Sequence, residues 1–124
     1  MSLIVQKYGG TSVGTVERIQ AVADKVATSY RSGNQLVVAV SAMSGETNRL
    51  IGLAEEIDKR PSLREMDVLV STGEQVTIAL LCMALGKVGI EARSYTGSQV
   101  RILTDSSHGK ARIQAIDSHL IEAI

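Results

Sequence analysis

The sequence of 124 residues contains no tryptophan and no phenylalanine, and its only aromatic side chains are three tyrosines. Nucleic-acid-binding proteins commonly stack bases on aromatic rings and bind phosphates with clustered basic residues. Here 13 basic and 13 acidic residues give a formal net charge of zero. The scarcity of aromatic residues and the balanced charge therefore argue against a nucleic-acid partner.

Cysteine is also scarce. The single cysteine, Cys82, excludes an internal disulfide and is typical of a reducing compartment. It lies in an apolar run, where a small core residue is commoner than a reactive thiol. His108 and His119 have no Cys, Asp or Glu set at ligand spacing, so no protein-bound metal is predicted. Without a leader or an apolar run of membrane-spanning length, the chain is predicted to be cytoplasmic, with no membrane partner.

A glycine-rich segment follows the first apolar run of the chain. Residues 7–14 read Lys-Tyr-Gly-Gly-Thr-Ser-Val-Gly. Glycines let the main chain approach an anion closely, and a following helix N-terminus adds unpaired N–H donors. The lysine precedes the glycines, whereas a Walker A loop places it after them. From the pattern alone, phosphate binding and a plain tight turn are about equally well supported.

The hydrophobic pattern predicts an α/β domain. We expect strands at residues 3–6, 36–40, 90–95, 100–103 and 111–116, and helices at 16–30, 47–58, 63–70 and 76–85 and from about 117. A strand, a helix and a second strand of these lengths form a right-handed parallel unit, so both strands end at the same sheet edge. Residues 7–10 and 41–45 should therefore meet at that edge, where open α/β sheets bind ligands.

Residues 76–85 form the most apolar segment, with Thr77 as the only conventionally polar residue. A helix that is apolar on all sides must be buried on all sides. A chain of this length has little material to surround it. We therefore expect this helix to contact a second subunit or a part of the domain that is absent from the chain.

Three motifs resemble, in order, those of the aspartate kinases, within the wider amino-acid kinase superfamily. They are residues 7–14, residues 40–48 (Val-Ser-Ala-Met-Ser-Gly-Glu-Thr-Asn) and residues 69–75 (Leu-Val-Ser-Thr-Gly-Glu-Gln). The resemblance covers the whole chain. It implies a three-layer αβα fold with a mainly parallel central sheet. Residues 1–124 would be the N-terminal portion only, without the nucleotide-binding half and the ACT regulatory domains.

The reaction implied by the resemblance transfers the γ-phosphoryl group of ATP, with Mg²⁺, to the side-chain carboxylate of L-aspartate, in lysine, threonine and methionine synthesis. A carboxylate is already ionised at neutral pH, so no general base is needed. The difficulty is repulsion between two anions, which positioning and positive charge overcome. This requirement accounts for a lysine and glycines without a Ser/His/Asp set. The apolar segment at residues 76–85 leads us to expect a homo-oligomer.

The resemblance assigns the site residues. It makes Lys7 catalytic, places Lys7, Tyr8, Gly9, Gly10 and Ser41 at the ATP phosphates, and places Thr47 and Glu74 at aspartate, with Glu74 binding its α-ammonium group. The spacing alone leaves other interpretations open. Lys7 could be a solvated strand-end lysine, and Thr47 an ordinary first-turn residue. Helix caps could account for Ser41, Ser44 and the Ser71–Glu74 pair.

Two positions depart from the family pattern. Ser98 replaces a common tryptophan, and Arg101 replaces a small apolar residue. Arg93, Arg101 and Arg112 are interpreted as surface charges. One alternative function is a related kinase acting on glutamate, acetylglutamate, carbamate or a nucleotide. The other is a non-catalytic fragment or association module, since the isolated chain is expected to turn over poorly.

Overall fold

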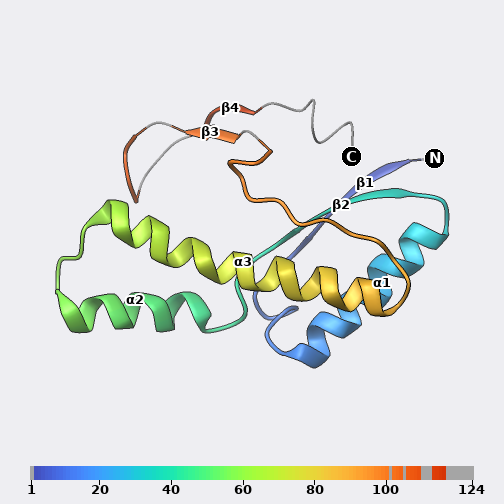
Figure 1. Ribbon diagram of the computed structural model, residues 1–124, viewed down its shortest axis with the longest axis horizontal. Helices are drawn as coiled ribbons and strands as arrows, with labels where there is room; N and C mark the ends of the chain where they lie inside the picture. Colours follow the sequence, from blue (N-terminus) through green and yellow to red (C-terminus); the bar gives the residue numbers. More distant parts are fainter. Residues whose placement is uncertain (1, 101, 105, 110–112, 117–124) are drawn as a thin grey trace.

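The structure is a computed structural model and describes residues 2–100, 102–104, 106–109 and 113–116. Its elements are β1 (Leu3–Tyr8), α1 (Val16–Arg31), β2 (Gln35–Val40), α2 (Glu46–Ile57), α3 (Leu63–Lys87), β3 (Ile102–Thr104) and β4 (Ile113–Ile116). Figure 1 shows α3 as the long central helix, with α2 beside one half of it and α1 beside the other. The predicted α/β class is confirmed.

Strands β1 and β2 form a parallel pair, joined by α1 as predicted. The register runs from Leu3 opposite Gln35 to Tyr8 opposite Val40. One further hydrogen bond, from the Ser41 N–H to the Tyr8 carbonyl at 3.1 Å, extends the pairing one residue past the end of β2. The segments that follow the two strands therefore leave the sheet at the same edge.

Helix α1 begins at the predicted residue and ends one residue later than predicted. Thr15 is the N-cap, and its side-chain oxygen accepts a hydrogen bond from the Arg18 N–H at 3.1 Å. At the other end, Gly33 adopts a positive φ of 95°, a conformation that glycine adopts without strain. Its N–H donates to the Tyr30 carbonyl at 3.0 Å. Gly33 therefore ends the helix.

The Thr15 cap allows a simple stability test. Replacing Thr15 with alanine is expected to lower the free energy of unfolding by about 1 kcal/mol, because a donor of the first turn loses its partner. Urea unfolding followed by circular dichroism measures the change. Thr15→Ser retains the accepting oxygen and should cost much less. Equal losses in the two variants would show that the cap contributes nothing.

The core lies between the sheet and two helices, α1 and α3. Its buried members are Val13, Ile19, Val22, Ala23, Val26, Ala27, Leu81, Leu85 and Ile90. Tyr8, Leu36, Val38 and Val40 pack against them from one face of the sheet. On the other face, Leu3 and Val5 are 49% and 68% exposed. Among the described elements, the helices that contact the sheet therefore cover one face only.

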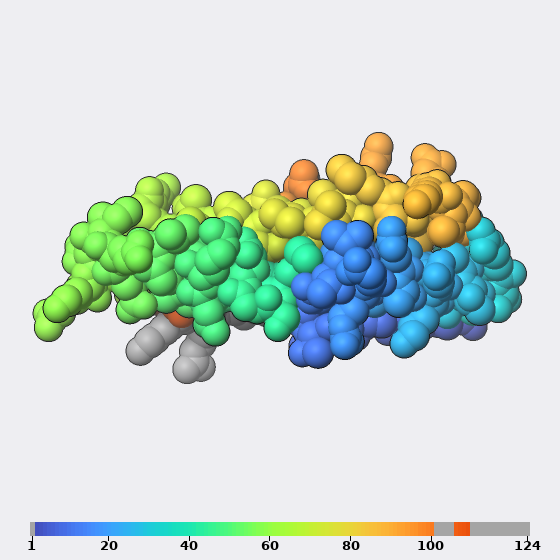
Figure 2. Space-filling view, turned by 90° about the horizontal axis from the view of Figure 1, so that it is seen from below, coloured from blue at the N-terminus to red at the C-terminus, as the bar shows by residue number. Residues whose placement is uncertain are grey.

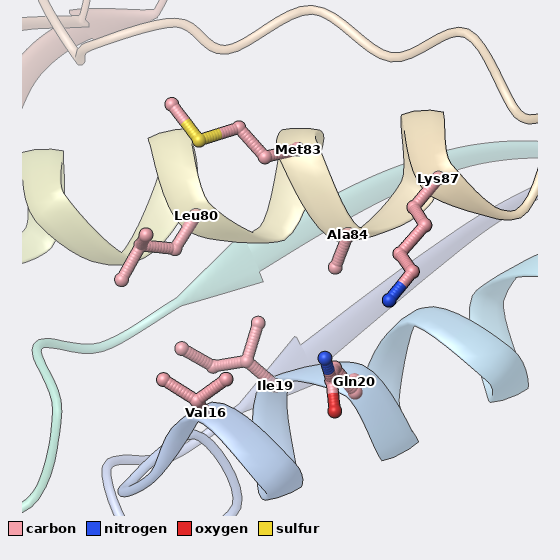
Figure 3. A pocket seen from close by; sticks show the side chains of 7 residues that line it. All are labelled: Val16, Ile19, Gln20, Leu80, Met83, Ala84 and Lys87. Atoms are coloured by element: carbon pink, nitrogen blue, oxygen red, sulfur yellow. The ribbon is translucent and has the colours of Figure 1, made fainter.

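The helices are packed side by side. Figure 2 shows α2 and α1 next to one another along α3. Between α1 and α3 lies a small apolar hollow of about 210 Å³ (Figure 3), lined by Val16, Ile19, Gln20, Leu80, Met83, Ala84 and Lys87. None of these residues belongs to the three motifs. The hollow is therefore a packing feature of the helix pair.

Helix α3 is continuous, which corrects the prediction of separate helices at 63–70 and 76–85. Ser62 caps its start, and its side-chain oxygen accepts from the Glu65 N–H at 3.4 Å. The hydroxyls of Ser71 and Thr72 instead donate to carbonyls of the preceding turn, at 2.8 and 2.7 Å. The polar residues in the middle of α3 therefore satisfy their hydroxyls without ending the helix.

The C-terminus of α3 is closed by glycine. Gly89 has a φ of 87°, and its N–H donates to the Gly86 carbonyl at 3.1 Å. The Ile90 N–H donates to the Leu85 carbonyl at 2.9 Å. These two bonds form a Schellman motif. Ile90, 8% exposed, then packs in the core beside Leu85.

Burial along α3 differs from what its sequence suggested. Thr77, the polar residue of the apolar segment, is completely buried, and its hydroxyl donates to the Gly73 carbonyl at 3.3 Å. Met83, in the same segment, is 68% exposed. A helical hydroxyl bonded to its own backbone can be buried at low cost, whereas burial of an apolar side chain requires a neighbour. The position of the neighbouring elements therefore decided which residues are buried.

By length and composition, α3 could cross a membrane. This corrects the expectation that no run reaches that length, an expectation that treated α3 as two shorter helices. The helix nevertheless packs against α1, α2 and β2. Its charged residues include Arg64, Glu65 and Asp67 near its start and Glu74 near its middle. We therefore describe α3 as the central helix of the packed domain.

Residues 90–95 do not form the predicted strand. A strand requires hydrogen bonds to a neighbouring edge. Here a cavity of about 530 Å³ lies between this segment and β2, which lines it with Leu36, Val38 and Val40. The gap accounts for the missing strand. The predicted strands at 100–103 and 111–116 correspond to β3 and β4, an antiparallel pair, and the helix predicted from about 117 lies outside the described residues.

Candidate functional site

The loop after β1 is built from successive tight turns. The N–H groups of Ser12, Val13 and Gly14 donate to the carbonyls three residues earlier, at 3.0, 3.3 and 3.4 Å. The Val13 side chain is completely buried in the core and anchors the loop. The glycine-rich segment therefore has a defined shape in this structure.

The loop packs against the turn that follows β2. A Cβ atom on Gly10 would lie 3.0 Å from the Ala42 carbonyl oxygen, and one on Gly14 would lie 3.2 Å from the Ser44 Cβ. Both distances are shorter than ordinary carbon contacts of about 3.5 Å or more. Gly9 has no such neighbour within 4 Å. The first two motifs are therefore in contact, and Gly10 and Gly14 make the close approach possible.

The turn after β2 begins α2 without a side-chain cap. Gly45 occupies the N-cap position with a φ of 81°, and no side chain bonds to the first turn. The interpretation of Ser41 and Ser44 as caps is therefore wrong, because a glycine in a left-handed conformation occupies the cap position. Thr47, exposed in the first turn of α2, lies two residues after this glycine.

The third motif contacts the second through Gly73. A Cβ atom on this residue would lie 2.9 Å from the Ala42 Cβ and 3.7 Å from the Glu46 Cγ. The middle of α3 therefore lies directly against the turn that follows β2. The Ser71–Glu74 pair is not a capping box, because both residues lie inside a continuous helix.

Glu74 is exposed and lines a cavity of about 460 Å³. The remaining walls come from β2, from α3 and from the segment after it: Leu36, Val37, Val38, Ala39, Val40, Ser71, Gln75, Ile78, Arg93, Tyr95, Thr96, Gly97 and Val100. The cavity thus combines an apolar wall with one acidic and one basic side chain. This combination can accept a small polar molecule that carries charges of both signs.

Lys7 lies in the last part of β1, which is two residues longer than predicted. It is exposed and stands opposite Ala39 in the parallel register. Ala39 belongs to the wall of the Glu74 cavity. Lys7 is therefore one strand away from that cavity, at the same edge of the sheet as the glycine-rich loop.

Tyr8 and Ser41 have distinct surroundings. The Tyr8 side chain packs against the core, and its hydroxyl donates to the Gln6 Oε1 at 3.1 Å. The Tyr8 carbonyl accepts from the Ser41 N–H. The Tyr8 ring is therefore engaged with the core and with Gln6. Ser41 is half-buried between the first two motifs.

One ion pair is present at the start of α2. Arg49 donates to both carboxylate oxygens of Glu46, at 3.0 and 2.6 Å. These hydrogen bonds stabilise the charged form and lower the pKa of Glu46 below its usual value. Both residues belong to α2, so the pair lies within the first turn of that helix, beside Gly73 of α3.

Two further titratable groups are perturbed. A hydrogen bond with Tyr95 raises the pKa of Arg93, which the sequence analysis interpreted as a surface charge. Arg93 is exposed but stands on the wall of the Glu74 cavity, a position that no motif indicated. Burial raises the pKa of the half-buried Cys82 thiol, which disfavours the reactive thiolate. Within the described residues, no group of three or more His, Cys, Asp or Glu side chains could hold a metal ion.

Comparisons with known proteins agree on one group of relatives. Residues 2–124 match the amino acid kinase family. The chain is 68% identical to an aspartokinase of Pseudomonas aeruginosa over 123 residues, which are 99% of this chain and 30% of the relative. An aspartokinase of Geobacillus stearothermophilus is 55% identical over 95% of the chain and 29% of the relative. The chain thus spans about 30% of the length of these relatives.

Solved structures share the fold. A crystal structure of aspartate kinase from Synechocystis has a TM-score of 0.79 and 52% identity, covering 97% of this chain and 20% of that one. E. coli aspartokinase III, in complex with aspartate and ADP, has a TM-score of 0.78 at 23% identity, covering 90% of this chain and 35% of that one. The second similarity concerns the fold alone.

Proposed function

Because this chain belongs to the amino acid kinase family, we propose that it forms the aspartate-binding and phosphate-binding part of an aspartate kinase. The observation that carries the proposal is the contact of all three motifs through Ala42, which lies against both Gly10 and Gly73. The kinase would transfer the ATP γ-phosphoryl group to the side chain of L-aspartate, for lysine, threonine and methionine synthesis. The proposal is supported by 68% identity to a named aspartokinase.

The site residues divide into a group that would bind the ATP phosphates and a group that would bind aspartate. Lys7 and the N–H groups of Gly9 and Gly10 would stabilise the negative charge on the ATP phosphates. The Ser41 hydroxyl would donate to the same phosphates. Thr47 and Glu74 would bind aspartate, with the Glu74 carboxylate paired to its ammonium group. The apolar wall and the charges of the Glu74 cavity suit a free amino acid.

The remaining parts of the proposal concern the complete enzyme. Mg²⁺ would arrive with the ATP phosphates and neutralise part of their charge. The chain would supply the N-terminal part of the kinase domain, without the nucleotide-binding half or ACT domains, and would be inactive alone. We further propose a cytoplasmic homo-oligomer that uses the exposed apolar side of α3, where Val76 and Met83 are 45% and 68% exposed.

Calorimetric titration of this chain with L-aspartate, and separately with Mg-ATP, tests the proposal. We expect aspartate to bind, and Glu74→Ala to weaken binding by at least about tenfold, because a charged hydrogen-bond partner of the ammonium group is lost. Glu55→Ala removes an exposed carboxylate from α2 and serves as the matched control. Its affinity should equal that of the unsubstituted chain.

The same titrations separate the alternatives. Binding of glutamate in preference to aspartate would indicate a related kinase. Absence of binding by either ligand would contradict a preformed site in this chain and would favour the non-catalytic fragment. Aspartate binding that is unchanged in Glu74→Ala would remove Glu74 from the site.

A further inference from the structure

Gly73 lies in the middle of a helix, where glycine is unfavourable relative to alanine. No positive φ accounts for it, because the positive-φ glycines are Gly33, Gly45, Gly89 and Gly109. The side toward Ala42, however, has no space for a methyl group, since a Cβ on Gly73 would lie 2.9 Å from the Ala42 Cβ. The glycine is therefore explained by close approach and not by backbone conformation.

Ala42 is held from two sides. It is 6% exposed, and its carbonyl oxygen would lie 3.0 Å from a Cβ on Gly10. Two glycines from different elements thus contact one alanine, Gly10 from the loop after β1 and Gly73 from α3. The Ala42 atoms that face them are backbone and Cβ atoms, which cannot rotate away as a long side chain could. The contact is consequently rigid.

We propose that Gly73 and Ala42 are positioning residues, whose contact sets the distance between Glu74 on α3 and the loops that carry Lys7, Gly10 and Ser41. This inference rests on the proposed function for the roles of those residues. Glu74 follows Gly73 directly in the helix, so any displacement of α3 at Gly73 moves Glu74 with it. The distance between Glu74 and the loops that carry Lys7, Gly10 and Ser41 then depends on the close contact between Gly73, which has no side chain, and the Ala42 methyl group.

The size of the effect follows from the geometry. Carbon atoms in contact prefer separations of about 3.5–4.0 Å, so a methyl group at 2.9 Å requires a shift of roughly 0.6–1 Å. Displacements of about 1 Å between reacting groups can lower rates about 100-fold. Gly73→Ala should therefore move α3 away from the turn after β2, although alanine favours helix formation.

The test is a double-mutant cycle on the full 124-residue chain. The variants are Gly73→Ala, Ala42→Gly and the pair together, since Ala42→Gly removes the atom with which the new methyl group collides. Gly86→Ala is the matched control, because it lies in the same helix and a Cβ there would meet nothing within 4 Å. Amide NMR spectra report the positions of residues 9–14 and 41–46, and calorimetry reports aspartate affinity.

We expect Gly73→Ala to shift the amide signals of both loops and to weaken aspartate binding at least about tenfold. The double variant should restore both, and Gly86→Ala should leave both unchanged. Unchanged loop signals in Gly73→Ala, or a double variant no closer to the parent than Gly73→Ala, would overturn the inference. If the parent chain binds no aspartate, the proposed function fails for this chain, and the amide signals alone decide the positioning role.

Discussion

Lys7→Ala is expected to lower kcat on the order of 10²–10³-fold, the usual effect of removing one charge-stabilising donor from a transition state. The proposed reaction brings two anions together, so loss of a positive charge at the phosphates directly raises the barrier. Lys7 is exposed near the end of β1. Its removal should therefore change the free energy of unfolding by less than about 0.5 kcal/mol.

The assay requires a complete kinase. A suitable protein is the Pseudomonas aeruginosa aspartokinase with its matching 30% replaced by this chain, a substitution that 68% identity makes practicable. Aspartyl phosphate formation is measured for the chimera, for Lys7→Ala and for Lys25→Ala, an exposed lysine of α1. Near-normal turnover in Lys7→Ala would contradict the catalytic role. A folded chimera without activity would contradict the proposed function itself.

Leu81→Ala is expected to have the largest effect on stability, lowering the free energy of unfolding by about 2–5 kcal/mol. Leu81 is 5% exposed and belongs to the cluster that joins α1, α3 and the sheet. Its truncation removes apolar contacts and leaves a cavity where these elements meet. Whole domains are stable by only about 5–15 kcal/mol. The variant should therefore unfold at a much lower urea concentration.

Met83→Ala provides the comparison for Leu81→Ala. Met83 lies two residues further along the same helix, at the rim of the hollow in Figure 3, and is 68% exposed. Its truncation should change the free energy of unfolding by no more than about 0.5 kcal/mol. Because the proposed homo-oligomer would cover this side of α3, both variants are compared at a protein concentration at which the chain is monomeric. Similar losses in both variants under that condition would contradict the exposure of Met83.

Local rules predicted the first third of the fold well. The apolar runs before Lys7 and before Ser41, together with the helix between them, specify a parallel pair with both ends at one edge. Gly33 and Gly89 end their helices because each adopts a positive φ. The amino-acid kinase fold inferred from the three motifs is confirmed by the solved structures.

Predictions were less successful where an outcome depended on the neighbours of a segment. Residues 69–75 resemble a helix start, yet Ser71 and Thr72 bond to carbonyls of the preceding turn and α3 continues. Residues 90–95 have a strand-like composition, but a cavity lies between them and β2. Thr77 is buried and Met83 exposed because of the direction from which the other elements approach α3.

The sequence by itself determined the types of the principal elements and the edge at which the first two motifs meet, because hydrophobic period, glycine conformation and connection handedness are properties of the chain. Only the tertiary structure decided how closely the third motif approaches them. The 2.9 Å distance between a Cβ on Gly73 and the Ala42 Cβ depends on the packing of α3 against a turn about thirty residues away in the chain. No local pattern contains that distance, because it results from the packing of all the elements together.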